Sequence, residues 1–519
     1  MSLILRFVLV SLALLFVGDY ITVGLSPFFL ISWAISIACT YQLAQQTRHH
    51  AILWAIASFI APFIAPFFLA ISKPKPYGAL SLVDNSWFNM ERPTNLMMVT
   101  GVLFFEELLS LPDIKQTVSE RLLSMPRFRQ KVKHLGRHAS WLDDDQFNLD
   151  DHISEYYLSG SGDPLGSGDA IAFQNHVNEL SSQPLDFNMP LWHIELVQSS
   201  SGKSAAIFRI HHCIGDGIAL IRVLLSLTDN TPTAKSNTKA KSTLNPQPRT
   251  PPPKPSNNDN SAQTTPAQEF WHQVVGFAAA IKKGVMLPDA HTSLKNPLTG
   301  KRVTAWSEPV SVEKVRSLAH LHGAKINDIV LATTAGAIRH YLRSQGEEVD
   351  GIVLRVLVPI NLRPLDGPLE LGNKVGFVYL PLPVDLEDPV ARLKAVKQTM
   401  DEIKGGQEAV LSYLFLTVIG TLPNNMQHFV IDTFNKNATS TMTNVPGPKE
   451  TLYLAHHKIS NMMFFGPQSG TMGVGISVLS YDGKITLGIN ADANLVKAPE
   501  KFSSFFKHEL ENWPTPQEN

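Results

Sequence analysis

The 519-residue sequence predicts an α/β fold with mixed sheets, divided into two lobes and preceded by an N-terminal membrane anchor. Three observations predict this organisation. From residue 80 onward, segments with strand-like alternation and segments with helical periodicity follow one another along the chain. A stretch rich in Pro, Ser, Thr and Asn at 229–268 separates two halves of similar size. Long apolar runs occupy most of the first 75 residues.

The apolar runs at the N-terminus are Leu3–Val17, Ile21–Cys39 and Ala51–Ile71. The third run contains no charged residue and is long enough to span a bilayer as a helix. We therefore expect two or three membrane helices within residues 1–75. Two alternatives remain open: the first run as a signal-peptide core, although no convincing cleavage site follows it, and a buried hairpin in a soluble core. Basic residues on the two sides of the third run nearly balance, so charge does not decide the orientation.

The two expected lobes cover 80–228 and 270–515, and the segment 229–268 between them lacks the aliphatic residues that a packed core requires. Its composition predicts a disordered crossover. The elements expected in the first lobe are a helix at 171–180 and strands at 192–198 and 205–210. Those expected in the second lobe are helices at 312–322, 326–345 and 390–404, strands at 352–359 and 375–382, and a hairpin of 473–479 with 484–490 around Tyr481-Asp482-Gly483.

Charge and cysteine content exclude several classes of protein. The chain carries 44 basic and 45 acidic side chains, so it lacks the positive charge that a nucleic-acid partner would require. Its only cysteines are Cys39 and Cys213, which cannot form a disulfide framework or a cysteine-based zinc site. We expect neither a nucleic-acid partner nor a metal site.

The candidate catalytic residues follow the strand expected at 205–210, where the chain reads His211-His212-Cys213-Ile214-Gly215-Asp216-Gly217. Acyl transfer to an alcohol needs a group that takes the hydroxyl proton while the oxygen attacks a thioester. Histidine suits this task because its pKa lies near neutral pH. A strand end beside a glycine-containing turn can present such a side chain to a cleft. A histidine pair alone is more often structural, so the pattern gains its weight from the rest of the chain.

The pattern resembles the His-His-x-x-x-Asp-Gly motif of the coenzyme-A-dependent acyltransferase superfamily, and further segments resemble its wax ester synthase/diacylglycerol acyltransferase family. Five segments in the expected order are much more specific than one motif, and the resemblance extends over roughly 80–500. The supporting segments are Pro184–Trp192 (PLDFNMPLW), Lys325–Ala332 (KINDIVLA), Pro359–Arg363 (PINLR), Gly372-Asn373 and Thr443–Pro448 (TNVPGP).

The resemblance implies two chloramphenicol-acetyltransferase-like lobes with a central tunnel, and it implies roles for individual residues. His212 is expected to be the general base and His211 a supporting residue. Asp216 is expected to be structural through an ion pair with Arg363, beside Gly217, where a close approach needs glycine. Asn327 is a candidate for substrate binding or oxyanion stabilisation, with a helix cap as an equally good alternative role.

The same resemblance implies the substrates. Acyl-CoA is expected as the acyl donor, with no separate cofactor, and either a long-chain fatty alcohol or a diacylglycerol as the acceptor. The bilayer is the expected partner, with the endoplasmic reticulum as the location and the catalytic body facing the cytosol. Two other functions remain open. The first is another acyl-CoA-dependent glycerolipid acyltransferase, because His211 and Asp216 also match the His-x-x-x-x-Asp spacing of that class. The second is a non-catalytic lipid-binding membrane protein on the same fold.

Overall fold

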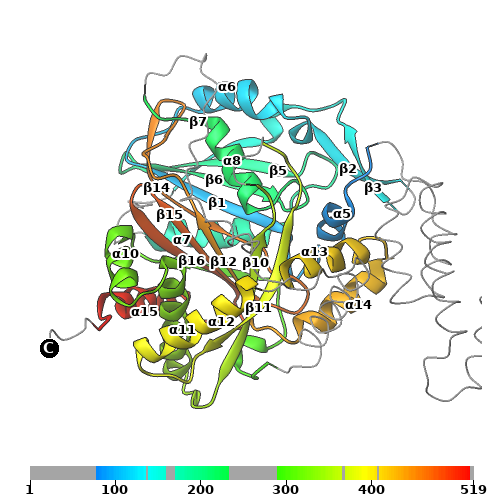
Figure 1. Ribbon diagram of the computed structural model, residues 1–519. Coiled ribbons are helices and arrows are strands. Elements are labelled where there is room, and N and C mark those ends of the chain that lie inside the picture. The colour runs from blue at the N-terminus through cyan, green and yellow to red at the C-terminus, as the bar shows by residue number, and fades with distance from the viewer. Residues whose placement is uncertain are drawn as a thin grey trace, which may run out of the picture.

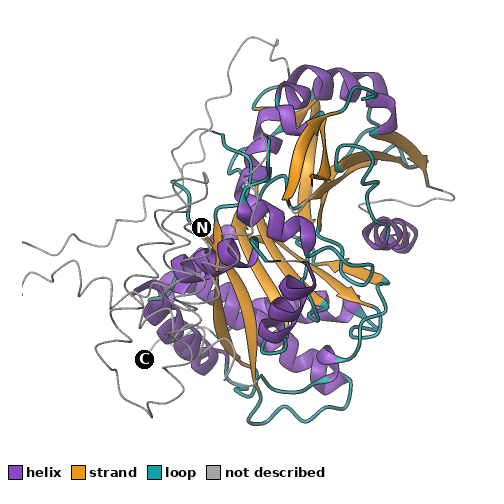
Figure 2. Cartoon of the chain, turned by 90° about the vertical axis from the view of Figure 1, so that its right-hand side faces the viewer, coloured by secondary structure: helices purple, strands orange, loops and turns teal. Residues whose placement is uncertain are grey.

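The computed structural model describes residues 78–135, 138–158, 170–232, 289–364, 369–405, 408–422 and 424–514. Within these ranges the protein is an α/β structure built on two large mixed sheets (Figure 1). Figure 2 shows, in a view turned by 90°, helices on both sides of the strands. The predicted anchor at 1–75 and most of the predicted linker lie outside the described residues. No helix within the described ranges combines the length and the apolar character needed to cross a membrane.

The first sheet is mixed, with strand order β4-β5-β6-β1-β14-β13-β7. Only β4 and β5 are parallel neighbours; the other pairs are antiparallel. Helix α8 (Gly217–Leu227) packs on one face, and α7 (Ala170–Ser182) contributes to a core on the other. The strands are β1 (Met98–Phe105), β4 (Ile153–Tyr157), β5 (Trp192–Gln198), β6 (Ser204–His211), β7 (Thr228–Asp229), β13 (Tyr453–Leu454) and β14 (His457–Phe465).

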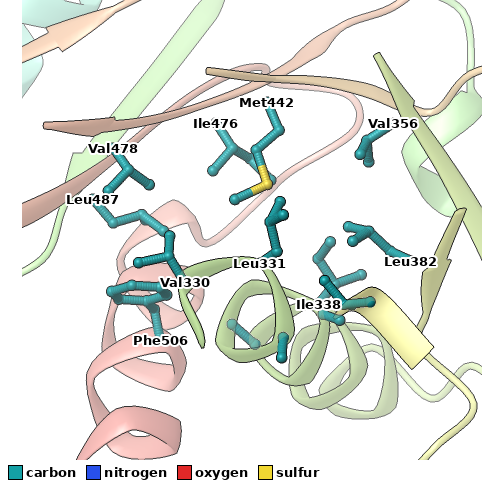
Figure 3. Packing of buried hydrophobic residues seen from close by; sticks show 14 of the residues in the cluster. Val330, Leu331, Ile338, Val356, Leu382, Met442, Ile476, Val478, Leu487 and Phe506 are labelled. Carbon is teal, nitrogen blue, oxygen red and sulfur yellow. The ribbon is translucent and has the colours of Figure 1, made fainter. Parts of the chain in front are cut away.

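The second sheet has the order β11-β10-β12-β15-β16-β8, with β9 paired to β16. Its core includes side chains of α11 (Ile326–Ser344), which pack against residues of several strands and of α15 (Pro499–Glu511) (Figure 3). The strands are β8 (Arg302–Trp306), β9 (Val310–Ser311), β10 (Val353–Asn361), β11 (Val375–Pro383), β12 (Ser440–Pro446), β15 (Val474–Tyr481) and β16 (Lys484–Asp492), and the other helices are α10 (Val312–Leu321) and α12 (Pro389–Gly405).

Four further α-helices and a two-stranded ribbon belong to the part of the chain that the structure describes. Helices α5 (Leu82–Asn89), α13 (Glu408–Ile419) and α14 (Asn424–Asn435) lie together on one side of the molecule (Figure 1). Helix α6 (Leu111–Arg121) packs against α8, and β2 (Gln130–Leu135) pairs with β3 (His138–Asp143).

The division between the two sheets differs from the predicted division of the chain into lobes 80–228 and 270–515. Strand β14 comes from the C-terminal half of the chain but pairs with β1 inside the first sheet. The start of the predicted linker also needs correction, because Asp229 belongs to β7, pairs with Tyr453 and forms an ion pair with Arg121. The two halves of the sequence are therefore joined by a shared sheet.

Local patterns predicted the individual elements well. Strand β5 has the predicted bounds, and α7, α10 and α11 begin and end within two residues of the expected positions. The hairpin of β15 and β16 turns through Asp482 and Gly483, both with positive φ, as a two-residue type I′ turn requires.

Candidate active site

The predicted base His212 lies directly after β6, at the point where that strand leaves the first sheet. Its backbone N–H donates to Met97 O at 2.7 Å, which continues the pairing of β6 with the chain before β1. The following turn closes with a hydrogen bond from Ile214 N to His211 O at 3.0 Å. The His212 side chain is buried. The strand and the turn together fix the backbone from which the imidazole projects.

The imidazole of His212 stacks on the indole of Trp87. The ring centroids are 3.9 Å apart and the planes meet at 21°. Trp87 comes from α5, a helix that begins with Ser81 as its N-cap, whose hydroxyl accepts from Asp84 N at 3.0 Å. Phe377 of β11 lies 6.1 Å from the indole by centroid distance. The His212 ring is thereby held against an aromatic surface to which both halves of the chain contribute.

Burial determines the protonation state of His212. Loss of hydration lowers its pKa to about 4; the Asp216 carboxylate raises the pKa in part, and His211 lowers it. The imidazole is therefore neutral at pH 7, which is the form that can accept a proton. Its Nδ1 is buried and makes no hydrogen bond with the described part of the protein.

Asp216 pairs with Arg363, as the sequence predicted. Arg363 NH2 lies 3.0 Å from Asp216 Oδ2, and both side chains are buried. The same carboxylate accepts from Ala219 N at 3.0 Å, as the N-cap of α8, and from Lys374 N at 2.8 Å. Arg363 also donates to the carbonyls of Glu370 and Gly372. A buried charge pair with further hydrogen bonds to both partners holds the turn after His212 in place.

Gly372 and Asn373 join the segment after β10 to the turn after His212. Gly372 N donates to Ile214 O at 2.8 Å, and its φ of +98° is a conformation that favours glycine. Asn373 Nδ2 donates to His212 O at 2.9 Å and to Asp84 Oδ1 at 2.8 Å. The Asp84 carboxyl is buried beside Arg127, and this burial raises its pKa although the guanidinium acts in the opposite direction. Asp84 and Asn373 thus fix the His212 carbonyl from the far side of the turn.

The contacts of His211 are not those expected of a catalytic base. Its Nδ1 accepts from Cys213 N at 3.1 Å, and its Nε2 lies 3.3 Å from Glu91 Oε2. The side chain is only 1% exposed. Both ring nitrogens therefore face protein groups, which fits a supporting residue.

The structure corrects two of the roles expected for Gly217 and Asn327. A Cβ on Gly217 would meet Val445 only at 3.6 Å, so the close approach that requires glycine is at Gly215, where a Cβ would lie 3.0 Å from that of Ala219. Asn327 does not cap α11, because the N-cap is Lys325, whose N–H donates to Asp328. The side-chain oxygen of Asn327 instead accepts from Asn444 Nδ2 at 2.9 Å.

An apolar cavity lies between α8 and the first sheet. Gly217 lines it at the start of α8, whereas His212 is not among its lining residues. Every lining residue is apolar or glycine. The walls come from β1, β5, β6 and β14 below and α8 above, with Val445 and Leu479 contributed by the second sheet. An entirely apolar lining of this kind suits an alkyl chain.

Sequence reasoning missed Trp87, Asp84 and Asn373 as residues of the site. The Ser81-x-x-Asp84 spacing is a helix-start pattern and was a usable signal for α5. It carries no information about the contact with His212, which is more than 120 residues away. The sequence indicates Gly372 and Asn373 only as one segment of the family resemblance.

The arrangement belongs to a known class of two-lobed α/β proteins. A wax ester synthase/diacylglycerol acyltransferase from Marinobacter aquaeolei shares the fold with a TM-score of 0.59, at 17% identity, over 83% of this chain and 98% of its own. A condensation domain of the calcium-dependent antibiotic synthetase shares it with a TM-score of 0.53, at 14% identity, over 85% and 98%.

The sequence comparisons are more specific. Family models match residues 80–330 as the wax ester synthase/diacylglycerol acyltransferase catalytic domain and residues 371–513 as the C-terminal domain of the same family. Wax ester synthase/diacylglycerol acyltransferase 5 of Arabidopsis thaliana is 25% identical over 77% of this chain and 86% of its own. A probable diacylglycerol O-acyltransferase of Mycobacterium tuberculosis is 25% identical over 73% and 83%. The chain belongs to the wax ester synthase/diacylglycerol acyltransferase family.

Proposed function

We propose that this protein is an O-acyltransferase that moves a fatty acyl group from acyl-CoA to the hydroxyl of a long-chain alcohol or a diacylglycerol, with His212 as the general base. The observation that carries the proposal is a neutral, buried His212, stacked on Trp87, in a motif whose Gly217 lines the apolar cavity. Family membership supports the reaction class and both acceptors.

In the proposed reaction, His212 takes the proton of the acceptor hydroxyl while the oxygen attacks the thioester carbonyl carbon. The tetrahedral intermediate then collapses, the carbon–sulfur bond breaks, and the coenzyme A sulfur leaves with the proton from the imidazolium. The products are an ester and free coenzyme A. A base that is neutral at pH 7 enters this cycle without prior deprotonation. The apolar cavity beside Gly217 is the proposed place for a hydrocarbon chain of one of the substrates.

The alternative use of His211 as the base, by analogy with glycerolipid acyltransferases, fits the geometry less well. A base needs a ring nitrogen with a free lone pair, but Nδ1 of His211 accepts from Cys213 N–H, so in the neutral ring Nε2 carries the proton and faces Glu91. A non-catalytic lipid-binding protein would not need a neutral, buried His212. Measurement of turnover distinguishes an enzyme from such a protein.

We further propose that residues 1–75 anchor the protein in the endoplasmic reticulum membrane with the catalytic body on the cytosolic side. The support is the length of the apolar runs and the different solubilities of the two substrates, since acyl-CoA is water-soluble and the acceptor partitions into lipid. Deletion of residues 1–72 should release much of the protein from membranes and leave measurable transfer to an acceptor in detergent.

The acceptor is tested with the purified full-length protein, radiolabelled palmitoyl-CoA, and hexadecanol or dioleoylglycerol offered in the same detergent. Formation of wax ester, triacylglycerol or both, lost in His212→Ala, supports the proposal. No ester from either acceptor, with a folded protein and intact acyl-CoA, would refute it.

A further inference from the structure

The hairpin of α13 and α14 presents apolar side chains to the outside of the molecule. Val410 is 50% exposed, Met426 44% and Phe429 72%, and all three lie on these two helices. Leu414 and Val418 are half-buried and follow Val410 at four-residue intervals, so they share one face of α13. We call the surface formed by Val410, Leu414, Val418, Met426 and Phe429 the hairpin face.

Helix α14 buries part of its apolar surface and leaves another part outside. Ile431 is buried in the core, and the Phe434 ring lies 4.4 Å by centroid distance from the ring of Phe415 on α13. Met426 and Phe429 remain exposed. A surface helix in water normally buries its apolar stripe and exposes polar side chains. Further apolar side chains outside the buried stripe are expected where the outer side of the helix meets an apolar medium.

Both helices of the hairpin are attached to α5 and the chain after it. A Cβ on Gly420, directly after α13, would lie 2.0 Å from Leu82 O, so the backbones approach as closely as glycine allows. Ser86 Oγ also donates to Leu416 O of α13 at 2.9 Å. On α14, His428 Nε2 lies 2.7 Å from Asn89 O, and Asp432 pairs with Arg92 at 3.0 Å.

The first residues that the structure describes lie beside the hairpin. The described chain begins at Gly78, just before α5, and α5 packs against both α13 and α14. The third apolar run ends at Ile71, seven residues earlier, which is about 25 Å of chain at full extension. If that run lies in a bilayer, the hairpin face is close enough to touch the same bilayer.

The charge of the hairpin indicates which kind of lipid surface it fits. The segment 408–435 contains no lysine or arginine, and its acidic residues are Glu408 and the paired Asp432. Attraction to anionic headgroups needs basic side chains, whereas insertion of apolar side chains does not. The hairpin face is thus suited to a bilayer whose lipids carry no net charge, such as phosphatidylcholine.

We propose that the hairpin face of α13 and α14 inserts into the surface of a neutral lipid bilayer and forms a second membrane contact beside the N-terminal anchor. The contact would orient the body with α5, which carries Trp87, next to the lipid. The proposal rests on the anchor proposed above for residues 1–75, but it does not depend on the acyl-transfer reaction.

The test uses full-length protein with Cys39 replaced by alanine and one new cysteine carrying a fluorescent label, reconstituted in phosphatidylcholine vesicles. Phe429→Cys is the probe and Leu321→Cys the matched control, since Leu321 is 49% exposed at the end of α10, away from the hairpin in Figure 1. Cys213 is buried, and burial raises the pKa of its thiol, so it resists labelling.

Two quenchers give a decisive readout. The label at 429 should be quenched severalfold more by phosphatidylcholine with a spin label on the acyl chain than by aqueous iodide, at low and at high salt, and the label at 321 should show the opposite. Quenching at 429 by iodide alone means that the hairpin face is in water and overturns the proposal. Protection of 429 from both quenchers means that protein, either the N-terminal segment or a second copy, covers the face, and this also overturns it.

Discussion

The indole of Trp87 and the imidazole of His212 are stacked, with 3.9 Å between their centroids and 21° between their planes. The contact joins the first helix of the catalytic body to the histidine that follows β6. It contributes to the burial that lowers the pKa of His212 to about 4.

Replacing Trp87 with leucine should expose His212 to water and raise its pKa toward the unperturbed value of about 6.5. A base works in its deprotonated form, so the acid limb of the kcat/KM profile should move upward from near pH 4. The expected loss at pH 5 is about 10-fold greater than the loss at pH 8. Trp87→Phe keeps an aromatic ring and should stay near the wild-type profile. An unchanged acid limb in Trp87→Leu would show that the stack does not control the base.

The two adjacent histidines should respond differently to truncation. His212→Ala should lower turnover by about 10² to 10⁴, the usual worth of a general base, while the protein stays folded. His211→Ala leaves the buried N–H of Cys213 without an acceptor, so it should cost about 1–3 kcal/mol of stability and less turnover. Rates and thermal unfolding of both variants decide the assignment. Near wild-type turnover in His212→Ala would end it.

Breaking the Asp216–Arg363 pair should damage folding more than catalysis. Arg363→Met leaves a buried carboxylate without its partner, a loss of about 3–5 kcal/mol in the free energy of unfolding. The double variant Asp216→Asn/Arg363→Met should lose less free energy of unfolding than the sum of the losses in the two single variants. Lys374→Met, which breaks the exposed pair with Glu370, is the control and should cost no more than about 1 kcal/mol. Additive losses in denaturant titrations would mean that the pair is not coupled.

Stability should fall as pH is lowered from 6.5 to 4. Burial lowers the pKa of His212 and of His193 to about 4, whereas both protonate near 6.5 in the unfolded chain. The unfolded state therefore binds more protons in this interval, and stability is complete above it. Each histidine accounts for at most about 2 kcal/mol between pH 6.5 and 5. His193→Gln should lose less stability than the wild type between pH 7 and 5, and an equal loss would contradict the assignment.

Cleavage in the segment between the lobes should leave the protein in one piece. A specific protease site placed at 245–250 separates the chain on either side, but β14 remains paired with β1 and β7 with β13. The two fragments should co-elute in size-exclusion chromatography and retain most of the activity. Separation of the fragments under native conditions would show that the shared sheet is not enough to hold them.

Sequence reasoning succeeded where the signal was local. The alternation of Trp192–Gln198 and the turn at Asp482-Gly483 reflect the period of two in a strand and the φ values of a tight turn, and both lie within a few residues. The Asp216–Arg363 pair spans 147 positions, and only the ordered motifs of the resemblance indicated it.

The failures were of two kinds. The prediction that Asn327 caps α11 was wrong, because the sequence did not show that the helix starts after Lys325. Lys325 is the N-cap, and its N–H donates to the side chain of Asp328. The stacking of Trp87 on His212 and the entry of β14 into the first sheet depend on how distant segments pack. Periodicity along the chain contains no information about such contacts.

The position of β14 also affects synthesis on the ribosome. Strand β1 is complete at Phe105, but its neighbour starts at His457, about 350 residues later. At typical elongation rates of 5–20 residues per second, this interval lasts roughly 20 to 70 s. During that time β1 presents unpaired N–H and C=O groups on the nascent chain, which is the kind of edge that invites aggregation. We expect the newly made N-terminal half to need chaperone protection until β14, in the last eighth of the chain, emerges.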